Sequence, residues 1–268
     1  MKYLLVTLLC FCSLAANANT EQFVRYQFQN KISYGQLIGQ DIYPIEGELF
    51  NQFTVTKDKL SVDKVDLLLP TVPEKVFAVG MNFASHLSSP SDAPPPLFLK
   101  LPSSLILSGE TVNVPSDAKN LHFEGELVLV IGKEAKNITE VQAQDIIFGV
   151  TVGNDLTERS WQGRDLQWMR SKASDGFGPI AATITRGIDY NNSLLTTRLN
   201  DKVVQQENTR FMIHSTSKVV SYLSQYFTLK PGDLIFMGTP GRTQALKNND
   251  VVSVTIDGVG KVENTIKW

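Results

Sequence analysis

The feature that most restricts how this 268-residue chain can fold is the apolar run LVLVI at residues 127–131. No polar residue interrupts it, and three of its five side chains are β-branched. Such a run is typical of a strand that is covered on both faces. We therefore expect a central strand here, with further layers of structure packed on each side of it.

Most other regular segments also have strand character. Residues 24–28 (VRYQF) alternate apolar and polar side chains at period two, which is typical of a half-buried strand. The stretches 145–155, 233–241 and 251–261 are apolar segments bounded by turn-forming residues. We expect a helix at residues 156–172. The predicted fold class is mostly β with some α.

Two prolines divide the chain into unequal parts. Pro70 and Pro73 interrupt regular pairing and predict a linker. We therefore place a small β-rich N-terminal domain at residues 19–73 and a larger, β-rich domain at residues 74–268. Within the larger domain, a proline cluster predicts a loop over residues 84–96 with at most one short helical turn.

The overall charge limits the class of binding partner. The formal net charge is -2 and the sequence pI is about 6.0, so no basic surface of the kind that nucleic acids require is expected. The apolar fraction of 42% is enough for a sizeable buried core. We predict a small-molecule ligand and no nucleic acid.

The first residues form a separate feature. A lysine at position 2 precedes an apolar run over residues 3–16, and the small-residue triplet Ala16-Asn17-Ala18 follows. This layout is typical of a secretory signal peptide over residues 1–18, which predicts a periplasmic or secreted protein without membrane contact after processing. A membrane anchor is the alternative, but the run is shorter than the roughly 20 apolar residues that span a bilayer.

Both cysteines, Cys10 and Cys12, lie in this first segment. A mature chain without them could form neither a disulfide nor a thiolate metal site. We therefore expect any bound metal to be held by oxygen or imidazole ligands.

Three acids stand close to the ends of the expected strands. Glu124 and Glu126 are two residues apart, so in a strand both side chains project from the same face. A solvated edge strand would explain such a pair, but the fully apolar run that follows makes a solvated face less natural. Asp155 ends the apolar segment before the expected helix, where it could serve as a helix N-cap. Alternatively, the three carboxylates form a hard oxygen site for Mg²⁺, Mn²⁺ or Ca²⁺.

Two further residues are candidates for contacts with a substrate. Lys172 follows the expected helix, although an isolated lysine is usually exposed. The tripeptide Gly238-Thr239-Pro240 follows an apolar strand and would bring backbone N–H groups and a hydroxyl to its end, which suits a carboxylate ligand. The same tripeptide could equally be a simple turn.

Read together and in order, six segments resemble the fumarylacetoacetate hydrolase family. They are VGMNFASH at 79–86, LFLK at 97–100, FEGELVLVIGK at 123–133, GVTVGNDLTERSWQ at 149–162, WMRSKASDGFGP at 168–179 and LKPGDLIFMGTPG at 229–241. The resemblance covers the chain from about Val76 to its end. It implies a mostly β catalytic fold, usually homodimeric, preceded by a smaller and more variable N-terminal domain.

The resemblance also implies roles for individual residues. The metal, most often Mg²⁺, would be held by the E-x-E pair and by the Asp of the N-D pair, which are Glu124, Glu126 and Asp155 here. Lys172 would face the oxygens of the substrate, and Thr239 would help to bind its carboxylate.

Two more positions match the motifs of the family. Gln162 matches a Gln that often lies near the site, and His86 matches the general base of hydrolytic members. A Glu three residues after that His is common in the family, but Ser89 stands there in this chain. Asp92 is a substitute partner that spacing alone does not establish. His122 and His214 match no motif and are predicted to be structural.

The function implied by the resemblance is metal-dependent hydrolysis of a C–C bond in a small 2-oxo or enol carboxylic acid of the acylpyruvate or fumarylpyruvate type. The alternatives are an isomerase or decarboxylase acting on a 2-hydroxy-dienoate or oxo dicarboxylate in aromatic catabolism. A non-catalytic, exported dicarboxylate-binding protein is the alternative from a different class.

Overall fold

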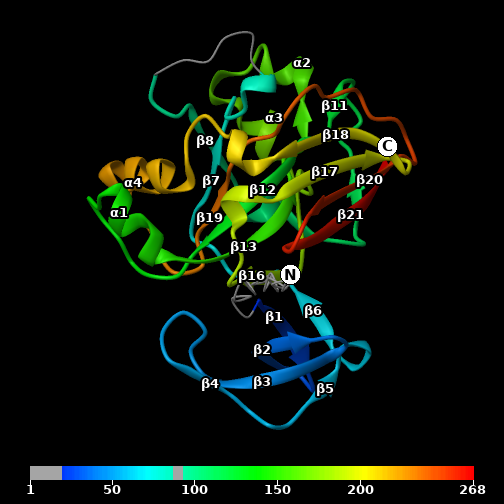
Figure 1. The fold of residues 1–268 in the computed structure, drawn as a ribbon. Coiled ribbons are helices and arrows are strands. Elements are labelled where there is room, and N and C mark those ends of the chain that lie inside the picture. The colour runs from blue at the N-terminus through cyan, green and yellow to red at the C-terminus, as the bar shows by residue number, and fades with distance from the viewer. Residues whose placement is uncertain (1–19, 87–92) are drawn as a thin grey trace, which may run out of the picture.

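The computed structural model describes residues 20–86 and 93–268, and it confirms the predicted fold class (Figure 1). Strands outnumber helices and form three sheets. Among the described residues, no helix is long and apolar enough to span a membrane.

The largest sheet has 14 strands. Those from the N-terminal part are β1 (Glu21–Phe28), β2 (Lys31–Ile38), β3 (Asp41–Gly47), β4 (Phe53–Val55), β5 (Leu60–Ser61) and β6 (Asp66–Leu68). The others are β7 (Val76–Val79), β8 (Leu97–Lys100), β9 (Leu105–Leu107), β12 (Gly125–Ile131), β13 (Ile147–Asn154), β15 (Gly178–Ile180), β16 (Thr183–Arg186) and β19 (Leu234–Phe236). The main path through the sheet is β4-β3-β2-β1-β16-β13-β12-β19-β7-β8.

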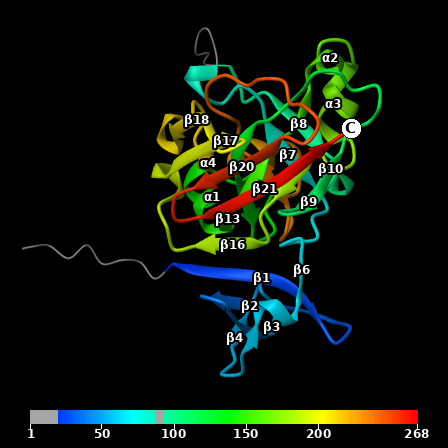
Figure 2. The same cartoon turned by 90° about the vertical axis from the view of Figure 1, so that its right-hand side faces the viewer.

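The N-terminal strands lie at one end of the molecule, drawn in blue in Figures 1 and 2. They are joined to the rest of the chain by hydrogen bonds, because β1 pairs with β16 and places Phe23 opposite Ile184. Phe23 also packs against Phe53 and Phe148, with Arg186 over all three rings. The small N-terminal part therefore shares both a sheet and an aromatic cluster with the larger part.

A second sheet has the order β10-β21-β20-β17-β18. Its strands are β10 (Thr111–Asn113), β17 (Leu194–Leu199), β18 (Lys202–Asn208), β20 (Val251–Ile256) and β21 (Gly260–Lys267). It lies against the large sheet in Figure 2. A third, two-stranded sheet consists of β11 (Leu121–His122) and β14 (Thr157–Glu158).

The central strand β12 is covered on both faces, as its apolar run predicts. Leu127, Leu129 and Ile131 are fully buried in a core cluster that includes residues of β17, β20 and β21. Val128 and Val130 point to the opposite face and are fully buried in a separate cluster with residues of β1 and β16. This alternation places successive side chains of β12 on opposite faces of the sheet.

The helices are short. The α-helices are α1 (Glu140–Ala143), α2 (Arg159–Gln162), α3 (Met169–Ala173) and α4 (Thr216–Tyr226). The 3-10 helices are η1 (Val62–Lys64), η2 (Ala84–His86), η3 (Pro102–Ser104), η4 (Gln144–Ile146), η5 (Leu166–Trp168), η6 (Tyr190–Asn192) and η7 (Thr209–Phe211). The single turn η2 is consistent with the loop predicted over residues 84–96.

The prediction of one helix over residues 156–172 is wrong. Thr157 and Glu158 belong to β14, and α2 ends at Gln162, where the C-cap Gly163 disfavours a continuing helix. Gln167 and Trp168 then both adopt φ of 58°, in the left-handed region, so the chain turns before α3 begins. The segment between the two short helices is at the surface, and Leu166 is 91% exposed.

Candidate metal centre and active site

The register of β12 and β13 brings the predicted acids together. Gly125 pairs with Asn154, so Glu124 and Asp155 lie side by side just beyond the paired residues. The Asp155 N–H donates to the Glu124 carbonyl oxygen at 2.8 Å. Glu126 follows Gly125 as the second residue of β12. The distant N-D and E-x-E segments thus meet at one end of the two strands.

The residue between the two glutamates must be a glycine. A Cβ atom added to Gly125 would lie 2.2 Å from Thr197 Oγ1 and 2.9 Å from a methyl group of Val254. The second sheet therefore packs directly against the backbone of the E-x-E segment. This close packing holds both glutamates in place.

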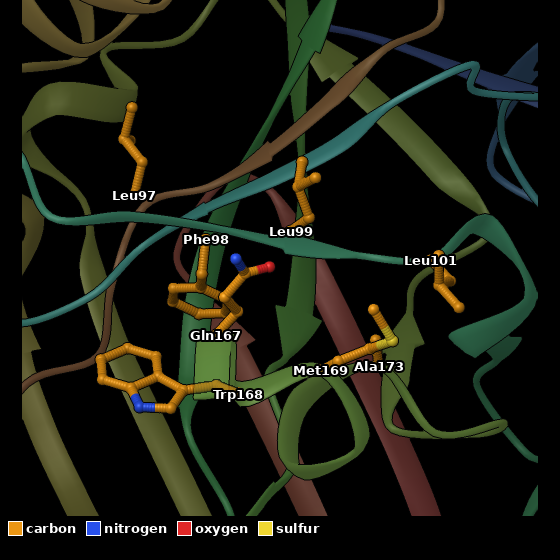
Figure 3. Close-up of a pocket in the computed structure, with 8 residues that line it drawn as sticks. All are labelled: Leu97, Phe98, Leu99, Leu101, Gln167, Trp168, Met169 and Ala173. Carbon is orange, nitrogen blue, oxygen red and sulfur yellow. The ribbon is translucent and has the colours of Figure 1, made fainter. Parts of the chain in front are cut away.

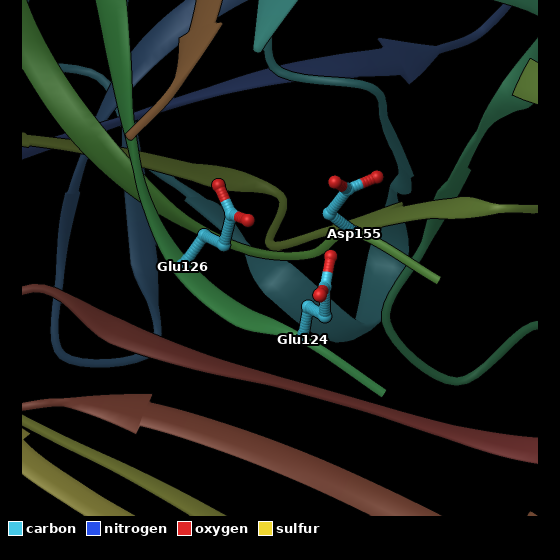
Figure 4. A group of neighbouring side chains, drawn as sticks. All are labelled: Glu124, Glu126 and Asp155. Carbon is cyan, nitrogen blue, oxygen red and sulfur yellow. The ribbon is translucent and has the colours of Figure 1, made fainter. Parts of the chain in front are cut away.

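The three acids converge in Figure 4. Each offers a carboxylate oxygen within 4.8 Å of the others, and Glu124, Glu126 and Asp155 are only 4%, 2% and 0% exposed. Asp155 does not cap a helix, since the N-cap of α2 is Glu158. Both simpler explanations of these acids, a solvated strand face and a helix cap, are therefore ruled out.

Two buried lysines and a partly buried arginine compensate the charge of two of the acids. Lys172 Nζ donates to Glu124 Oε2 and to Asp155 Oδ2, at 2.5 Å each, and its side chain is 3% exposed. Lys100 Nζ donates to Asp155 Oδ1 at 2.7 Å, and Arg159 donates to Glu124 Oε1. Lys172 is thus inside the site rather than at the surface.

These contacts separate the ionisation of the two glutamates. Burial raises the pKa of Glu124, but Lys172 and Arg159 together lower it well below its ordinary value. Burial, together with the charges of Asp155 and Glu124, raises the pKa of Glu126 well above its ordinary value. Glu126 forms no ion pair among residues 20–86 and 93–268. The cluster therefore still favours additional positive charge near Glu126.

This donor set fits a divalent cation. Three buried carboxylates provide hard oxygen ligands at mutual distances short enough for one ion, and no sulfur lies among them. Like charges so close together are stabilised by a cation between them. Glu124, Glu126 and Asp155 would hold the ion, most often Mg²⁺ or Mn²⁺ with such ligands.

The Gly238-Thr239-Pro240 segment lies beside the acids. The Gly238 N–H donates to Glu126 Oε2 at 2.7 Å, and Gly238 has φ of 94°, which suits glycine. Gln205, a buried residue of β18, donates to Thr239 Oγ1 at 2.9 Å and to the Pro240 carbonyl oxygen at 2.6 Å. Side-chain contacts hold this segment, so it is more than a simple turn.

The same segment reaches His86. His86 Nδ1 lies 2.5 Å from the Gly241 carbonyl oxygen, and the Gly241 N–H donates to Ser85 Oγ at 2.9 Å. Ser85 Oγ in turn donates to Glu207 of β18. Gly238 and Gly241 are three residues apart, so at most roughly 11 Å of backbone separates the contacts to Glu126 and to His86.

Within the described part of the chain, the hydrogen-bond partner of His86 is therefore a backbone carbonyl. A carbonyl oxygen only accepts hydrogen bonds, so this contact assigns the proton to Nδ1 and leaves the lone pair on Nε2. The suggested substitute partner Asp92, and Ser89, lie outside the described residues.

The other predicted residues surround this centre. Gln162 accepts a hydrogen bond from Arg159, whose guanidinium also contacts Glu124. Arg159 therefore connects Gln162 to the acids. His122 is held between Thr243 Oγ1 and Asn120 Oδ1, at 2.8 and 3.0 Å. These bonds support the structural role predicted for His122.

His214 is also buried, at 3% exposure, and its backbone N–H donates to Asn82 Oδ1 at 2.7 Å. Asn82 also donates to the carbonyl oxygens of His214 and Met237. Asn82 thus connects the segment that leads to His86 with the strand end before Gly238. These contacts involve only the backbone of His214, and its buried Nδ1 has no hydrogen-bond partner within the described ranges, so the structural role stays a prediction.

An apolar cavity of about 490 Å³ lies between β8 and the segment that leads into α3 (Figure 3). Its lining residues are Leu97, Phe98, Leu99, Leu101, Gln167, Trp168, Met169 and Ala173. Lys172 Nζ is 4.7 Å from the centre of the Phe98 ring, and Ala173 is the next residue in α3. The cavity and the acid cluster therefore share Phe98 as a boundary.

Sequence reasoning missed Lys100, Arg159 and Glu207. Lys100 ends the strand LFLK and is 2% exposed. A lysine flanked by apolar residues is the signal that could have identified it. Arg159 lies within the quoted N-D segment, only four residues after Asp155. Glu207 is far away in sequence and carries no local signal.

Comparison with known proteins gives the family. The profile described as fumarylacetoacetate (FAA) hydrolase C-terminal matches residues 75–267, and the profile described as Rv2993c-like, N-terminal, matches residues 22–70. Both matches are to sequence families, and together they cover most of the chain. The sequence resemblance stated above is thereby confirmed.

Individual relatives are enzymes of several types. The 4-hydroxyphenylacetate degradation bifunctional isomerase/decarboxylase of Escherichia coli is 35% identical over 241 residues, 86% of this chain and 54% of that protein. The mitochondrial oxaloacetate tautomerase fahd2 of Xenopus laevis is 34% identical over 223 residues, 77% of this chain and 70% of that protein. The crystal structure of 2-hydroxyhepta-2,4-diene-1,7-dioate isomerase from Mycobacterium marinum has a TM-score of 0.86 at 32% identity, over 92% of this chain and 98% of that chain.

The prediction of a signal peptide and a periplasmic location needs correction. Residues 1–18 lie outside the described residues and outside both family matches. The relatives reported above are enzymes, one of them mitochondrial, and none is described as exported. Export is therefore not supported, and an apolar N-terminal run was too weak a basis for it.

The match to the hydrolase profile spans well over half of the chain, and the matched residues include all three clustered acids, Lys172 and His86. The relatives show that one such fold serves isomerase, tautomerase and decarboxylase activities. The chain belongs to the fumarylacetoacetate hydrolase family.

Proposed function

We propose that this protein is an enzyme that moves a proton on a small 2-oxo or enol carboxylic acid, as a tautomerase or isomerase. The observation that carries this proposal is the combination of three buried carboxylates, a buried lysine bonded to two of them, and a histidine whose partner is neutral. The carboxylates and the lysine would stabilise an enolate. The neutral partner of the histidine favours proton transfer as the reaction that follows.

The acid cluster is suited to an oxyanion. A divalent cation at Glu124, Glu126 and Asp155 would supply a Lewis acid for the oxygens of a 2-oxo carboxylate. Lys172 places a second positive charge beside Glu124 in the buried acid cluster. The low dielectric there strengthens its attraction to a developing enolate. Arg159 and Lys100 keep the acids in position, since Arg159 contacts Glu124 Oε1 and Lys100 contacts Asp155 Oδ1. We call these two atoms the outer oxygens.

The Gly238-Thr239-Pro240 segment would orient the substrate. Thr239 is held by Gln205, and its hydroxyl can donate to a carboxylate while it accepts from the amide. We propose Thr239 and Gln162 as groups that bind the substrate carboxylate. Neither group changes its protonation state in this role.

His86 is proposed as the base that moves the proton. Its Nε2 would accept the proton, and the partner of its Nδ1 among residues 20–86 and 93–268 is the neutral carbonyl of Gly241, which would face the imidazolium that forms. A proton next to a 2-oxo group is already acidified by the substrate, whereas water must be activated by the base itself. The neutral partner therefore favours proton transfer at carbon over attack by water.

Two activities are second candidates. Hydrolysis of a C–C bond uses the same enolate and is supported by the presence of His86, which could activate water. Decarboxylation also passes through an enolate and is named for the Escherichia coli relative, alongside isomerisation. The non-catalytic, exported binding protein loses its basis with the loss of support for export.

We also propose that the protein is a homodimer. Leu99, Leu101 and Met169 line the apolar cavity and are 54%, 47% and 62% exposed, and Leu166 beside them is 91% exposed. Exposed apolar side chains gathered in this way are typical of a protein interface. A second copy of this chain would cover them.

The proposed function is tested with metal-loaded protein and a panel of 2-oxo acids, including oxaloacetate, acylpyruvates and fumarylpyruvate. Proton NMR in water distinguishes keto and enol forms, double-bond isomers, and the products of cleavage or decarboxylation. We expect keto–enol or double-bond interconversion of at least one substrate. A panel left unchanged at stoichiometric protein would rule out the enzymatic proposal.

A further inference from the structure

Lys172, a cation of the chain itself, already contacts two oxygens of the acid cluster, Glu124 Oε2 and Asp155 Oδ2. We call these two atoms the inner oxygens. Lys172 Nζ is 2.5 Å from both Glu124 Oε2 and Asp155 Oδ2, and the side chain is almost fully buried. Glu124 and Asp155 are two of the three acids that could hold one metal ion. Lys172 therefore contacts carboxylates that a divalent cation would need as ligands.

The outer oxygens of the same two acids have different partners. Asp155 Oδ1 accepts from Lys100 at 2.7 Å, and Glu124 Oε1 accepts from Arg159. Lys100 also donates to the carbonyl oxygens of Lys172 and Phe177, which fix it in the backbone around α3. Arg159 is likewise held by Gln162 and Thr243.

The three cations are therefore not equivalent. Lys100 and Arg159 contact Asp155 Oδ1 and Glu124 Oε1, which Lys172 does not contact, and both have further partners, so they can remain while an ion binds to the other oxygens. Lys172 donates to no other side chain than the two acids among the described residues. Its ammonium also lies 4.7 Å from the Phe98 ring, a contact that can stabilise a cation when the carboxylates release it.

We propose that Lys172 is the resident cation of this site: it neutralises Glu124 and Asp155 when no metal is bound, and it competes with the divalent ion for their inner oxygens. This inference deepens the proposed function and rests on it for the role of the metal. Metal binding would release the ammonium of Lys172 from the acids. The released ammonium is then available to the substrate, which links metal loading to the supply of the second positive charge.

Mn²⁺ binding measured by calorimetry tests this competition without any substrate. Lys172→Met removes the charge but keeps an unbranched side chain of similar length. We expect it to bind Mn²⁺ on the order of tenfold more tightly than the parent, because the competing charge is gone. Lys172→Arg retains the charge and should bind within a few-fold of the parent. Lys230→Met, which removes an exposed partner of Glu134, is the matched control and should match the parent.

Thermal unfolding supplies a second, independent reading. In EDTA, Lys172→Met should melt at a lower temperature than the parent, because two buried acids have lost their shared cation. Saturating Mn²⁺ should then raise its melting temperature by more than it raises that of the parent. If the variant unfolds in EDTA, Mn²⁺ added during refolding should restore it.

Parent-like or weaker Mn²⁺ affinity in Lys172→Met would overturn the proposal, as would failure of Mn²⁺ to restore an unfolded variant. A parent that binds no Mn²⁺ at all, while Lys172→Met is destabilised in EDTA, would instead contradict the metal site and leave the resident cation standing. The two failures are therefore distinguishable.

Discussion

The two ends of the segment 237–241 differ in how they use charge. At one end, the Gly238 N–H contacts Glu126 within a buried cluster of acids and cations. At the other end, the Gly241 carbonyl oxygen contacts His86, and no charge lies in that hydrogen bond. In the proposed site, charge is therefore concentrated where the anion would bind, while the partner of the proposed base that the structure describes is neutral.

The largest effect should come from breaking the charged end. Asp155→Ala removes one ligand and leaves Lys100 without its buried partner. We expect Mn²⁺ affinity to fall by more than roughly 100-fold and activity to be lost, because even residues behind metal ligands contribute 10–100-fold. Calorimetry and NMR turnover measure both effects. Glu134→Ala is the exposed control, and parent-like Mn²⁺ binding by Asp155→Ala would move the metal site elsewhere.

Breaking the neutral end should affect the rate but not the metal. His86→Ala removes the proposed base, a role worth roughly 10²–10⁴ in rate. We expect deuterium exchange at C3 of the substrate to slow by that factor while Mn²⁺ affinity stays within a few-fold of the parent. Exchange at the parent rate would show that another group moves the proton.

A smaller effect should follow from loosening the neutral end. Ser85→Ala removes both the acceptor of the Gly241 N–H and the donor to Glu207, which hold the His86 turn against its partner. A hydrogen bond of this kind contributes about 1 kcal/mol, so we expect kcat to fall by up to about tenfold. Thr54→Ala, at an exposed position of β4, is the control. An unchanged kcat would mean that Ser85 does not position His86.

The smallest effect on chemistry should come from the apolar surface next to the charged end. Leu166→Asp places a charge on the face proposed to bind a second copy, and light scattering should report the mass of one chain instead of two. Val141→Asp on α1, at a position 82% exposed, is the matched control and should leave the mass unchanged. A parent that is already monomeric would contradict the dimer.

The sequence predicted the charged end better than the neutral end, for a physical reason. Glu124 and Glu126 lie in one strand and Asp155 ends its neighbour, so local strand geometry was enough to bring them together. Strand β12 itself followed from its apolar run. The helix predicted over residues 156–172 failed because nothing local indicated the left-handed turn at Gln167 and Trp168.

The partner of His86 could not be predicted, because it is a backbone oxygen 155 residues away. Any residue type offers a carbonyl, so no side chain marks Gly241 as the partner. Glu207 reaches the same turn through Ser85, across 122 residues. Contacts of this kind depend on how β18 and the segment 237–241 pack, which a single sequence does not reveal.

The most direct measurement is a comparison of two rates on one substrate. Metal-loaded protein is given a fumarylpyruvate or acylpyruvate in D₂O, and NMR follows deuterium entry at C3 and release of the cleavage products together. A site with a charged end for the enolate and a neutral partner for its base should exchange C3 protons at least roughly tenfold faster than it cleaves the C–C bond. Cleavage at the rate of exchange, lost in His86→Ala, would contradict the proposed reaction and make this protein a C–C hydrolase.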